Sequence, residues 1–236
     1  MIKRSLLVLL GVAMVGAATL TAQAPRAEAQ ACPGVEVVFA RGTAEPAPPV
    51  GLTGLAFDAA LRTQLAGKSV AVYGVNYPAS SNFNNRLAFA QTVVNGVNNA
   101  QARVKYMASR CPGTKIVLGG YSQGAVVAGY ATNAGISLPP RYAQYTSKIP
   151  PPLPAAAASK VVAIVMFGPP SDRFLRDVGA PPIKIDPRLA TRTVRYCIPG
   201  DTICNGAPVG QPNGLHVLYT VNGMTFDAAR YVAARV

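Results

Sequence analysis

Short apolar runs rich in β-branched residues recur along the chain. Five of them predict β-strands: residues 35–40, 69–77, 115–118, 161–167 and 193–198. The runs lack a regular alternation of apolar and polar positions, which is typical of strands in a parallel sheet that is covered on both faces. The pattern therefore predicts a parallel sheet of about five strands.

Helical patterns separate these runs. One helix is expected over residues 52–65, with an apolar face formed by Leu55, Ala59 and Leu65. Another is expected over residues 86–107, with apolar positions at Phe89, Val93, Val97 and Val104. Alternating strands and helices predict one doubly wound α/β domain with helices on both faces of the sheet.

Two segments are rich in proline, residues 139–154 and 179–187. Proline cannot continue a helix or a central strand, because it lacks the backbone N–H and its ring fixes φ. Both segments are therefore expected to be surface loops.

The first residues have the pattern of an export signal. Lys3 and Arg4 precede an apolar run over residues 6–20, and small residues at alternate positions follow it. We expect residues 1–31 to be a signal peptide, cleaved after Ala29 or Ala31, and residues 32–236 to be the mature domain. A membrane anchor is the alternative, but the run is shorter than the roughly 20 residues that span a bilayer. The protein is expected to be extracellular, in solution or at the cell wall.

The amino-acid composition limits the class of protein to which the chain can belong and the kinds of partner it can bind. The 236 residues are 50% hydrophobic and 13% charged, which excludes a disordered chain. The net charge of +13 favours anionic partners such as a membrane or a cell-wall surface. Nucleic acid is not expected, because the basic residues are scattered and the chain has no tryptophan. A monomer is expected.

Four cysteines follow the signal segment: Cys32, Cys111, Cys197 and Cys204. An even number in an exported protein suggests two disulfides, for which three pairings are possible. The short spacing of Cys197 and Cys204 favours a small closed loop, which leaves Cys32 for Cys111. A zinc site is the alternative, but zinc needs closely spaced ligand pairs, which the cysteines and the single histidine do not supply. No metal and no cofactor are expected.

Residues 120–124 read Gly-Tyr-Ser-Gln-Gly and fit the pattern G-x-S-x-G. A predicted strand enters this segment, and the small-residue run 125–131 that leaves it predicts a helix. This is the strand–turn–helix context of a nucleophile elbow, in which a serine occupies a strained turn and the glycines let the strand and the helix approach. The pattern identifies Ser122 as a candidate nucleophile.

A serine nucleophile needs a base, and histidine is the side chain whose pKa suits that role near neutrality. The chain has a single histidine, His216, which is expected in a loop after the last predicted strand. The orienting carboxylate should lie between the serine and the histidine in chain order. The candidates are Asp172, Asp177, Asp186 and Asp201. We favour Asp201, because it directly follows a strand and lies between two cysteines; the alternative is a turn-forming aspartate without a catalytic role.

These residues carry a family resemblance. Residues 39–43 (Phe-Ala-Arg-Gly-Thr), the elbow, the two cysteines around Asp201, and His216 resemble the cutinase family of serine esterases. Residues 75–79 (Val-Asn-Tyr-Pro-Ala) resemble its actinobacterial, mycobacterial-type branch. The resemblance covers nearly all of residues 32–236.

The resemblance implies a lidless α/β-hydrolase with Ser122, Asp201 and His216 as the catalytic triad. It also implies disulfides Cys32–Cys111 and Cys197–Cys204. By position, Thr43 and Gln123 would form the oxyanion hole. The Gln123 role agrees with its place at the start of a helix, where backbone N–H groups point outward.

The implied activity is hydrolysis of carboxylic esters with short to medium acyl chains. Lipidic or polymeric esters, phospholipids included, are the expected substrates, because a basic protein concentrates at anionic surfaces. One alternative is an esterase that removes acetyl groups from polysaccharide. Another is a cell-surface module whose triad is silent.

Overall fold

The computed structural model describes residues 31–46 and 49–236, and the predicted signal peptide over residues 1–31 lies almost wholly outside them. The described chain contains a sheet of five parallel strands in the order β2-β1-β3-β4-β5. The strands are β1 (Val35–Ala40), β2 (Val70–Gly74), β3 (Lys115–Tyr121), β4 (Val161–Phe167) and β5 (Thr193–Tyr196). The predicted number of strands, their direction and the fold class are therefore confirmed.

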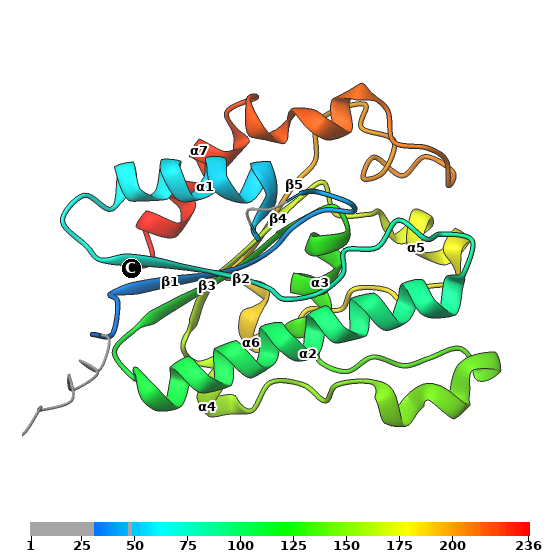
Figure 1. Ribbon diagram of the computed structural model, residues 1–236, viewed down its shortest axis with the longest axis horizontal. Helices are drawn as coiled ribbons and strands as arrows, with labels where there is room; N and C mark the ends of the chain where they lie inside the picture. The colour runs from blue at the N-terminus through cyan, green and yellow to red at the C-terminus, as the bar shows by residue number, and fades with distance from the viewer. Residues whose placement is uncertain (1–30, 47–48) are drawn as a thin grey trace, which may run out of the picture. The chain divides into compact units, whose positions relative to one another are not determined.

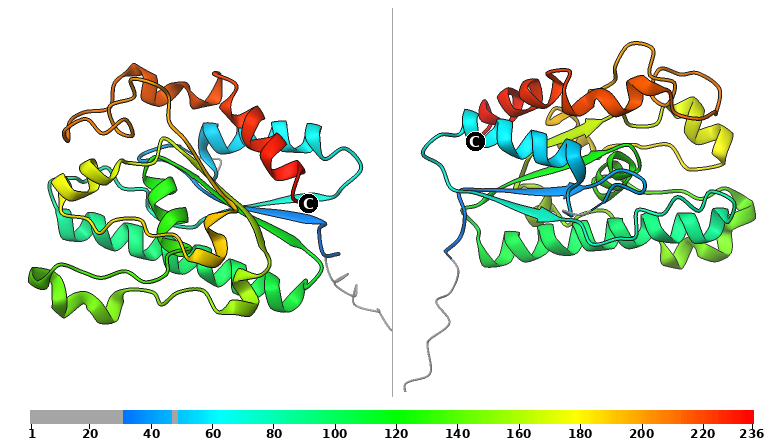
Figure 2. Two further views of the ribbon diagram at one scale, coloured as in Figure 1. Left: turned by 180° about the vertical axis from the view of Figure 1, so that it is seen from behind. Right: turned by 45° about the horizontal axis from the view of Figure 1, so that its top comes forward.

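Helices cover both faces of this sheet (Figure 1). One face carries α1 (Gly51–Gln64) and α7 (Met224–Ala233). The other carries α2 (Arg86–Arg110), α3 (Gln123–Ala131), α4 (Ala155–Ala158) and α6 (Pro187–Ala190). The short helix α5 (Asp172–Val178) lies toward the end of the molecule at which the strands finish, and the two views of Figure 2 agree on this layering. Within residues 31–46 and 49–236, no helix combines the length and the apolar character needed to cross a bilayer.

Side chains of β1 alternate between two hydrophobic clusters. Val37 and Phe39 pack with residues of α1 and α7, whereas Val38 and Ala40 pack with residues of α2 and α3. Because the apolar residues of β1 contribute in turn to one cluster or the other, the sheet is buried on both faces along this strand. This burial explains why the strand sequences lack polar alternation.

The apolar face predicted for the first helix was correct at Leu65, which is buried in the core, but wrong at Leu55 and Ala59. Leu55 is 39% exposed and Ala59 is exposed, whereas Phe57 and Leu61 are fully buried. The helix approaches the sheet through Gly54, where an added Cβ would lie 2.8 Å from the ring of Phe39. A small residue, which the hydrophobic pattern does not weigh, thus decides which side of α1 faces the core.

The proline-rich segments are more ordered than predicted. A 3₁₀-helix, η1 (Pro140–Lys148), forms within residues 139–154, and Leu153 is buried. In residues 179–187, Ile183 is buried in the core and Ile185 forms an isolated bridge with Asn133. Proline permits these arrangements because it can begin a helix and tolerates extended backbone. The prediction of surface loops was therefore wrong for part of each segment.

Candidate active site

Ser122 lies in the turn between β3 and α3, with φ 54° and ψ −116°. An L-residue rarely adopts this backbone, so the turn stores strain that its surroundings must hold. Its N–H donates to the carbonyl oxygen of Phe167 on β4 over 2.9 Å. The side chain remains partly exposed, as a nucleophile requires.

The two glycines of the elbow allow close packing of backbone on backbone. A Cβ at Gly120 would lie 2.1 Å from the carbonyl oxygen of Gly124, and a Cβ at Gly124 would lie 1.9 Å from that of Ala40. Neither contact is possible for a real side chain. The expectation that these positions must lack bulk is therefore confirmed.

Strained backbone concentrates at this edge of the sheet. Among the described residues, Ala44, Ala79 and Ser122 are the non-glycine residues with positive φ. They follow β1, β2 and β3, and the N–H of Ala44 donates to the carbonyl oxygen of Ala79 over 2.8 Å. The carboxyl ends of parallel strands are where ligands bind in open α/β sheets, so the strain coincides with the expected location of a site.

The structure brings Ser122, His216 and Asp201 into one line of polar contacts. His216 Nε2 lies 2.9 Å from Ser122 Oγ, and its Nδ1 lies 2.8 Å from Asp201 Oδ2. Asp201 is fully buried and His216 is 5% exposed. Because a carboxylate can only accept, Nδ1 carries the proton and Nε2 is free to accept from the serine hydroxyl.

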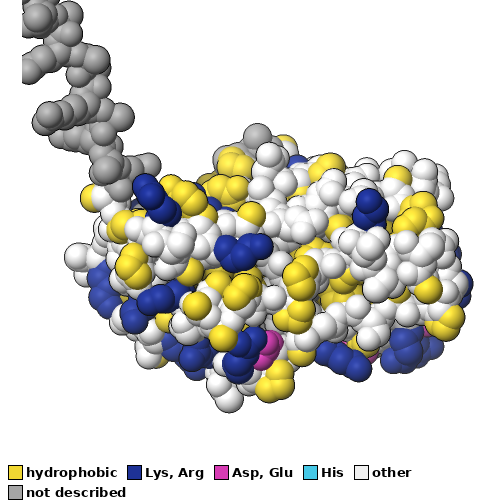
Figure 3. Space-filling view, turned by 90° about the horizontal axis from the view of Figure 1, so that it is seen from below, with side chains coloured by type: hydrophobic (Ala, Val, Ile, Leu, Met, Phe, Trp, Pro, Cys, Tyr) yellow, Lys and Arg dark blue, Asp and Glu magenta, His cyan; other side chains and the backbone are white. Residues whose placement is uncertain are grey.

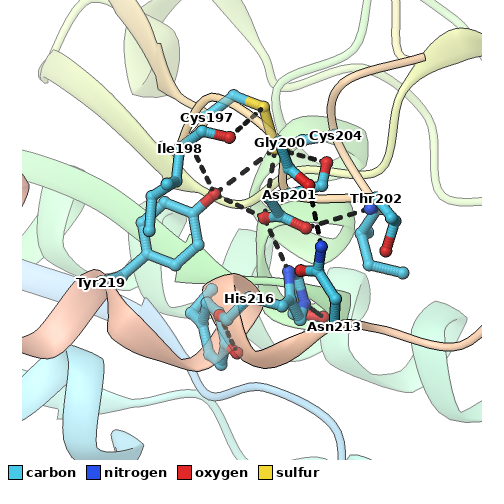
Figure 4. A network of polar contacts seen from close by, with 12 residues as sticks. Cys197, Ile198, Gly200, Asp201, Thr202, Cys204, Asn213, His216 and Tyr219 are labelled. Carbon is cyan, nitrogen blue, oxygen red and sulfur yellow. Dashed lines mark hydrogen bonds and ion pairs between the residues drawn. A yellow bond between two sulfur atoms is a disulfide. The ribbon is translucent and has the colours of Figure 1, made fainter. Parts of the chain in front are cut away.

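Asp201 lies at the centre of a wider network (Figure 4). Its Oδ1 accepts from the N–H of Ile203 over 3.0 Å, and its Oδ2 accepts from the hydroxyl of Tyr219 over 2.6 Å. The Tyr219 oxygen in turn accepts from the N–H of Ile198 over 3.1 Å. Burial, and after it the hydrogen bond to Asp201, raises the pKa of Tyr219 above its usual range, so this hydroxyl stays protonated and donates.

A disulfide closes the segment that carries Asp201. Cys197 and Cys204 are joined, and Cys32 is joined to Cys111, as the family resemblance implies. The sulfur of Cys204 lies 3.2 Å from Asp201 Oδ2, and an oxidised sulfur has no proton to donate to it. The sulfur therefore packs against the carboxylate without adding a hydrogen bond.

His216 belongs to a 3₁₀-helix, η2 (Gly214–Thr220), and the prediction of a loop at this position was wrong. Asn213, just before η2, donates from Nδ2 to the carbonyl oxygen of Gly200 over 2.8 Å, which links this segment to the one that carries Asp201. The hydroxyl of Tyr121 donates to the carbonyl oxygen of His216 over 2.7 Å, and the two rings lie 5.2 Å apart. The backbone and the ring of His216 are thus both fixed.

Thr43 and Gln123, the candidate oxyanion residues, lie at the same edge of the sheet. Gln123 is the first residue of α3, and its side-chain Nε2 donates to the carbonyl oxygen of Ser80 over 3.2 Å. Thr43 lies in the turn after β1, which is shaped by the carboxylate of Glu45. That carboxylate accepts from the N–H of Gly42 over 2.5 Å and from the N–H of Leu52 over 3.0 Å.

Three supporting residues were missed at the sequence level: Tyr219, Tyr121 and Glu45. Tyr219 follows His216 by three residues, a spacing that places two side chains on one side of a 3₁₀-helix. That signal was available only if the segment was taken as helical. Nothing in the local sequence of Tyr121 or Glu45 indicates which backbone groups they contact.

Comparisons with known proteins identify the family of this chain. A family model described as Cutinase matches residues 31–236. The chain is 43% identical over 215 residues to Phospholipase Culp4 of Mycobacterium tuberculosis, covering 91% of this chain and 84% of the relative. It is 43% identical over 174 residues to Probable carboxylesterase Culp7 of the same species, covering 74% of this chain and 89% of the relative.

A solved structure gives the same result in three dimensions. Trichoderma reesei cutinase in complex with a C11Y4 phosphonate inhibitor is similar to this chain with a TM-score of 0.62 and 31% identity, covering 86% of this chain and 76% of that one. The single domain with its five parallel strands is the α/β-hydrolase fold. The chain therefore belongs to the cutinase family and is a serine hydrolase of carboxylic esters.

Proposed function

We propose that Ser122 is the nucleophile, His216 the general base and Asp201 the residue that orients the imidazole. The observation that carries this proposal is the unbroken line of contacts from Ser122 Oγ through both ring nitrogens of His216 to Asp201 Oδ2. Nε2 takes the hydroxyl proton as Oγ attacks the ester carbonyl carbon, and then donates it to the oxygen of the leaving alcohol. A water molecule activated by the same nitrogen then releases the acid from the acyl-enzyme.

The backbone amides of Gln123 and Thr43 are proposed to hold the negative charge that develops on the carbonyl oxygen. Gln123 begins α3, where the N–H groups of the first turn have no partner inside the helix. The Thr43 turn is held by the Glu45 carboxylate on one side and by the Ala44–Ala79 hydrogen bond on the other. Donors fixed before the reaction stabilise the transition state without reorganising, which supports this assignment.

The proposed substrates are lipidic esters with short to medium acyl chains. Exposed apolar side chains lie in two segments next to site residues in the sequence or through a hydrogen bond. Phe83 and Leu87 follow β2 beside the Ser80 contact of Gln123, and Val217 and Leu218 directly follow His216. Apolar surface left in water beside a nucleophile favours an acyl chain or a lipid interface. The name of the relative Phospholipase Culp4 adds phospholipids to the candidates.

The proposed location is extracellular, after cleavage behind Ala29 or Ala31. Two disulfides within the described chain support an oxidising compartment. The N-terminal sequence of protein recovered from the culture medium would test this. A first residue at position 30 or 32 is expected, whereas retention of residues 1–29 on protein in the medium would contradict cleavage.

The decisive experiment replaces the nucleophile. Ser122→Ala should lower kcat/KM for a p-nitrophenyl ester by a factor on the order of 10⁴ or more, because no other group can form the acyl-enzyme. Ser109→Ala, which changes an exposed serine at the end of α2, is the matched control and should keep full activity. A phosphonate label should attach to Ser122 and be lost in Ser122→Ala. Labelling of a different serine would refute the assignment.

An acyl-length series on one alcohol then tests the substrate proposal. The rate should be highest for short to medium chains and should be retained with octanoyl esters, because the flanking apolar side chains can contact the extra methylenes. A rate confined to acetyl esters would contradict the proposed lipidic substrate and favour a polysaccharide deacetylase.

A further inference from the structure

Cations gather at the edge of the sheet that lies opposite Ser122. In a parallel sheet all strands begin at the same edge. Lys68 precedes β2, Lys115 begins β3, Lys160 precedes β4 and Arg192 precedes β5. Figure 3 shows several Lys and Arg side chains at the left of the view, where the strands begin in Figure 1, and others along the lower rim and at the right. This edge is therefore strongly basic.

A cavity of about 460 Å³ opens at this basic edge. Its lining residues are Lys115, Ser159, Val162, Thr191, Arg192 and Arg235. Three of them are cations and none is a carboxylate. The ion pairs of residues 31–46 and 49–236 use other cations, so none of the three has a carboxylate partner within 4.0 Å in that part of the chain.

The two arginines are held in place by backbone carbonyl groups. Arg192 donates from Nη1 to the carbonyl oxygen of Val161 over 2.7 Å, and Arg235 donates from Nη1 to that of Tyr231 over 2.7 Å. The guanidinium of Arg235 also stacks on the Tyr231 ring at 3.4 Å. A guanidinium carries five N–H donors, so each arginine is oriented by some and keeps others for a ligand.

We propose that this cavity binds the phosphate group of a small organic phosphomonoester. Such a group carries a charge of about −1.5 to −2 at neutral pH, which three unpaired cations match better than the single charge of a carboxylate. Arginine and lysine are the side chains that most often recognise phosphate oxygens. The cavity is open to solvent, so the glycerol or sugar that carries the phosphate can extend out of it while the cations hold the phosphate.

The cavity is far from the proposed nucleophile. Lys115 begins β3 and Ser122 follows its last residue, so the two are separated by seven strand steps or about 23 Å. A ligand in the cavity would therefore not compete with an ester at Ser122. A bound ligand would instead anchor the protein at the edge where the strands begin, and the opposite edge, which carries the triad, would remain accessible to an ester. This inference goes beyond the proposed esterase function and does not depend on it.

Titration calorimetry with glycerol 1-phosphate at low ionic strength tests the proposal. Lys115→Gln with Arg235→Gln should raise Kd at least tenfold, which is about 1.4 kcal/mol. The single variants Lys115→Gln and Lys105→Gln form a matched pair: both remove one exposed lysine charge, but Lys105 lies on α2 away from the cavity. Kd should rise clearly for the first and stay within about twofold for the second. Ser122→Ala protein should bind as tightly as the unaltered protein, which separates this test from that of the esterase.

Vesicles distinguish the two sources of such a phosphate. Phosphatidylcholine vesicles containing phosphatidic acid present a phosphomonoester, and vesicles containing phosphatidylglycerol present a phosphodiester. Flotation with phosphatidic acid that is lost in the Lys115→Gln, Arg235→Gln variant would assign a lipid headgroup, whereas binding of glycerol 1-phosphate alone would assign a soluble ligand. Equal weakening by Lys115→Gln and Lys105→Gln, or no binding of either probe up to a concentration on the order of 10 mM, would overturn the proposal.

Discussion

Ser122 and the Asp201–His216 pair meet in one site but are positioned by different means. Ser122 is fixed by backbone contacts: the strand before it, the helix after it, and the approach of Gly124 to Ala40. Asp201 lies in a turn segment and His216 in a short 3₁₀-helix, and they are fixed by a disulfide, the Tyr219 hydroxyl and the Asn213 amide. The elbow thus depends on the absence of side chains, and the other half depends on their presence.

This difference predicts how substitutions in each half of the site should affect stability and the catalytic rate. An elbow held by close backbone packing tolerates no added volume, so a single methyl group should disturb the fold and the site together. A segment held by side-chain links can lose one link and keep its fold, so a change there should act on the rate more than on stability. The three predictions that follow test this contrast, from the largest expected effect to the smallest.

Gly124→Ala should be the most damaging substitution. Its Cβ would lie 1.9 Å from the carbonyl oxygen of Ala40, so β1 and α3 must separate and Ser122 must move. We expect a loss of stability of about 3 kcal/mol and a fall in kcat of at least about 100-fold, measured by denaturant unfolding and ester turnover. Gly113→Ala is the control, because a Cβ there meets no atom within 4 Å. Equal stability of the two variants would show that the elbow does not depend on close packing.

Removing the Cys197–Cys204 disulfide should lower the rate more than the stability. Chain entropy gives about 2.4 kcal/mol for a link across seven residues and about 4.5 kcal/mol for the 79-residue separation of Cys32 and Cys111. Cys197→Ser with Cys204→Ser should lower kcat more than about tenfold with a modest fall in Tm, because Asp201 loses its restraint.

The comparison variant is Cys32→Ser with Cys111→Ser, which should lower Tm further and leave kcat nearly unchanged. Turnover should be measured well below both Tm values, with calorimetry for stability. If the variant without Cys197–Cys204 keeps its full kcat, the disulfide does not position Asp201.

Tyr219→Phe should have the smallest effect on the rate and a distinct effect on its pH dependence. A carboxylate with one donor fewer holds a protonated His216 more strongly, so the acid limb of kcat/KM should move to higher pH by less than about one unit. The fall in kcat should be about tenfold or less, since one hydrogen bond to a charged group is lost. Tyr219 remains a donor throughout the working range, because its pKa is raised by burial.

Tyr196→Phe is the matched control for this variant. Its ring stacks on Phe167, a residue that the Tyr219 ring also contacts, but no hydrogen bond joins it to the triad. Both variants should lower Tm slightly, and only Tyr219→Phe should move the acid limb. An unmoved acid limb in Tyr219→Phe would mean that the hydroxyl serves packing alone.

The contrast between the two halves also explains what the sequence could predict. The strands and the elbow can be predicted from local patterns. Runs of β-branched residues favour strands, and G-x-S-x-G followed by small residues is typical of a strand–turn–helix elbow. His216 could be chosen from the count of histidines, and Asp201 from chain order and its place after a strand and between two cysteines. The actual support of this pair comes from Tyr219 and Asn213, which act across distances in space that local sequence does not encode.

The errors in the helices have specific causes. The face of α1 was misassigned at Leu55 and Ala59, because Gly54 and Phe57 are the residues of this helix that meet Phe39. Helix α5 was not predicted, although Ser171 caps its start and Gly179 ends it in the left-handed conformation, two signals that the proline-rich surroundings outweighed. In both cases a glycine or serine determines the local structure, and the hydrophobic pattern takes no account of these small residues.

The crowding at Gly120 and Gly124 also limits how the site can diverge. Substitutions that change which ester is accepted cannot fall at Gly120 or Gly124, because a Cβ at either position would collide with backbone. Apart from Thr43, Asp201 and the cysteines around it, the loops after β1, β2 and β5 can change in length and sequence while the pairing of the strands is preserved. New specificities should therefore evolve by changes in these loops that keep Thr43, Asp201 and the two elbow glycines, and loop grafting that retains these residues is the practical route to redesigning this enzyme.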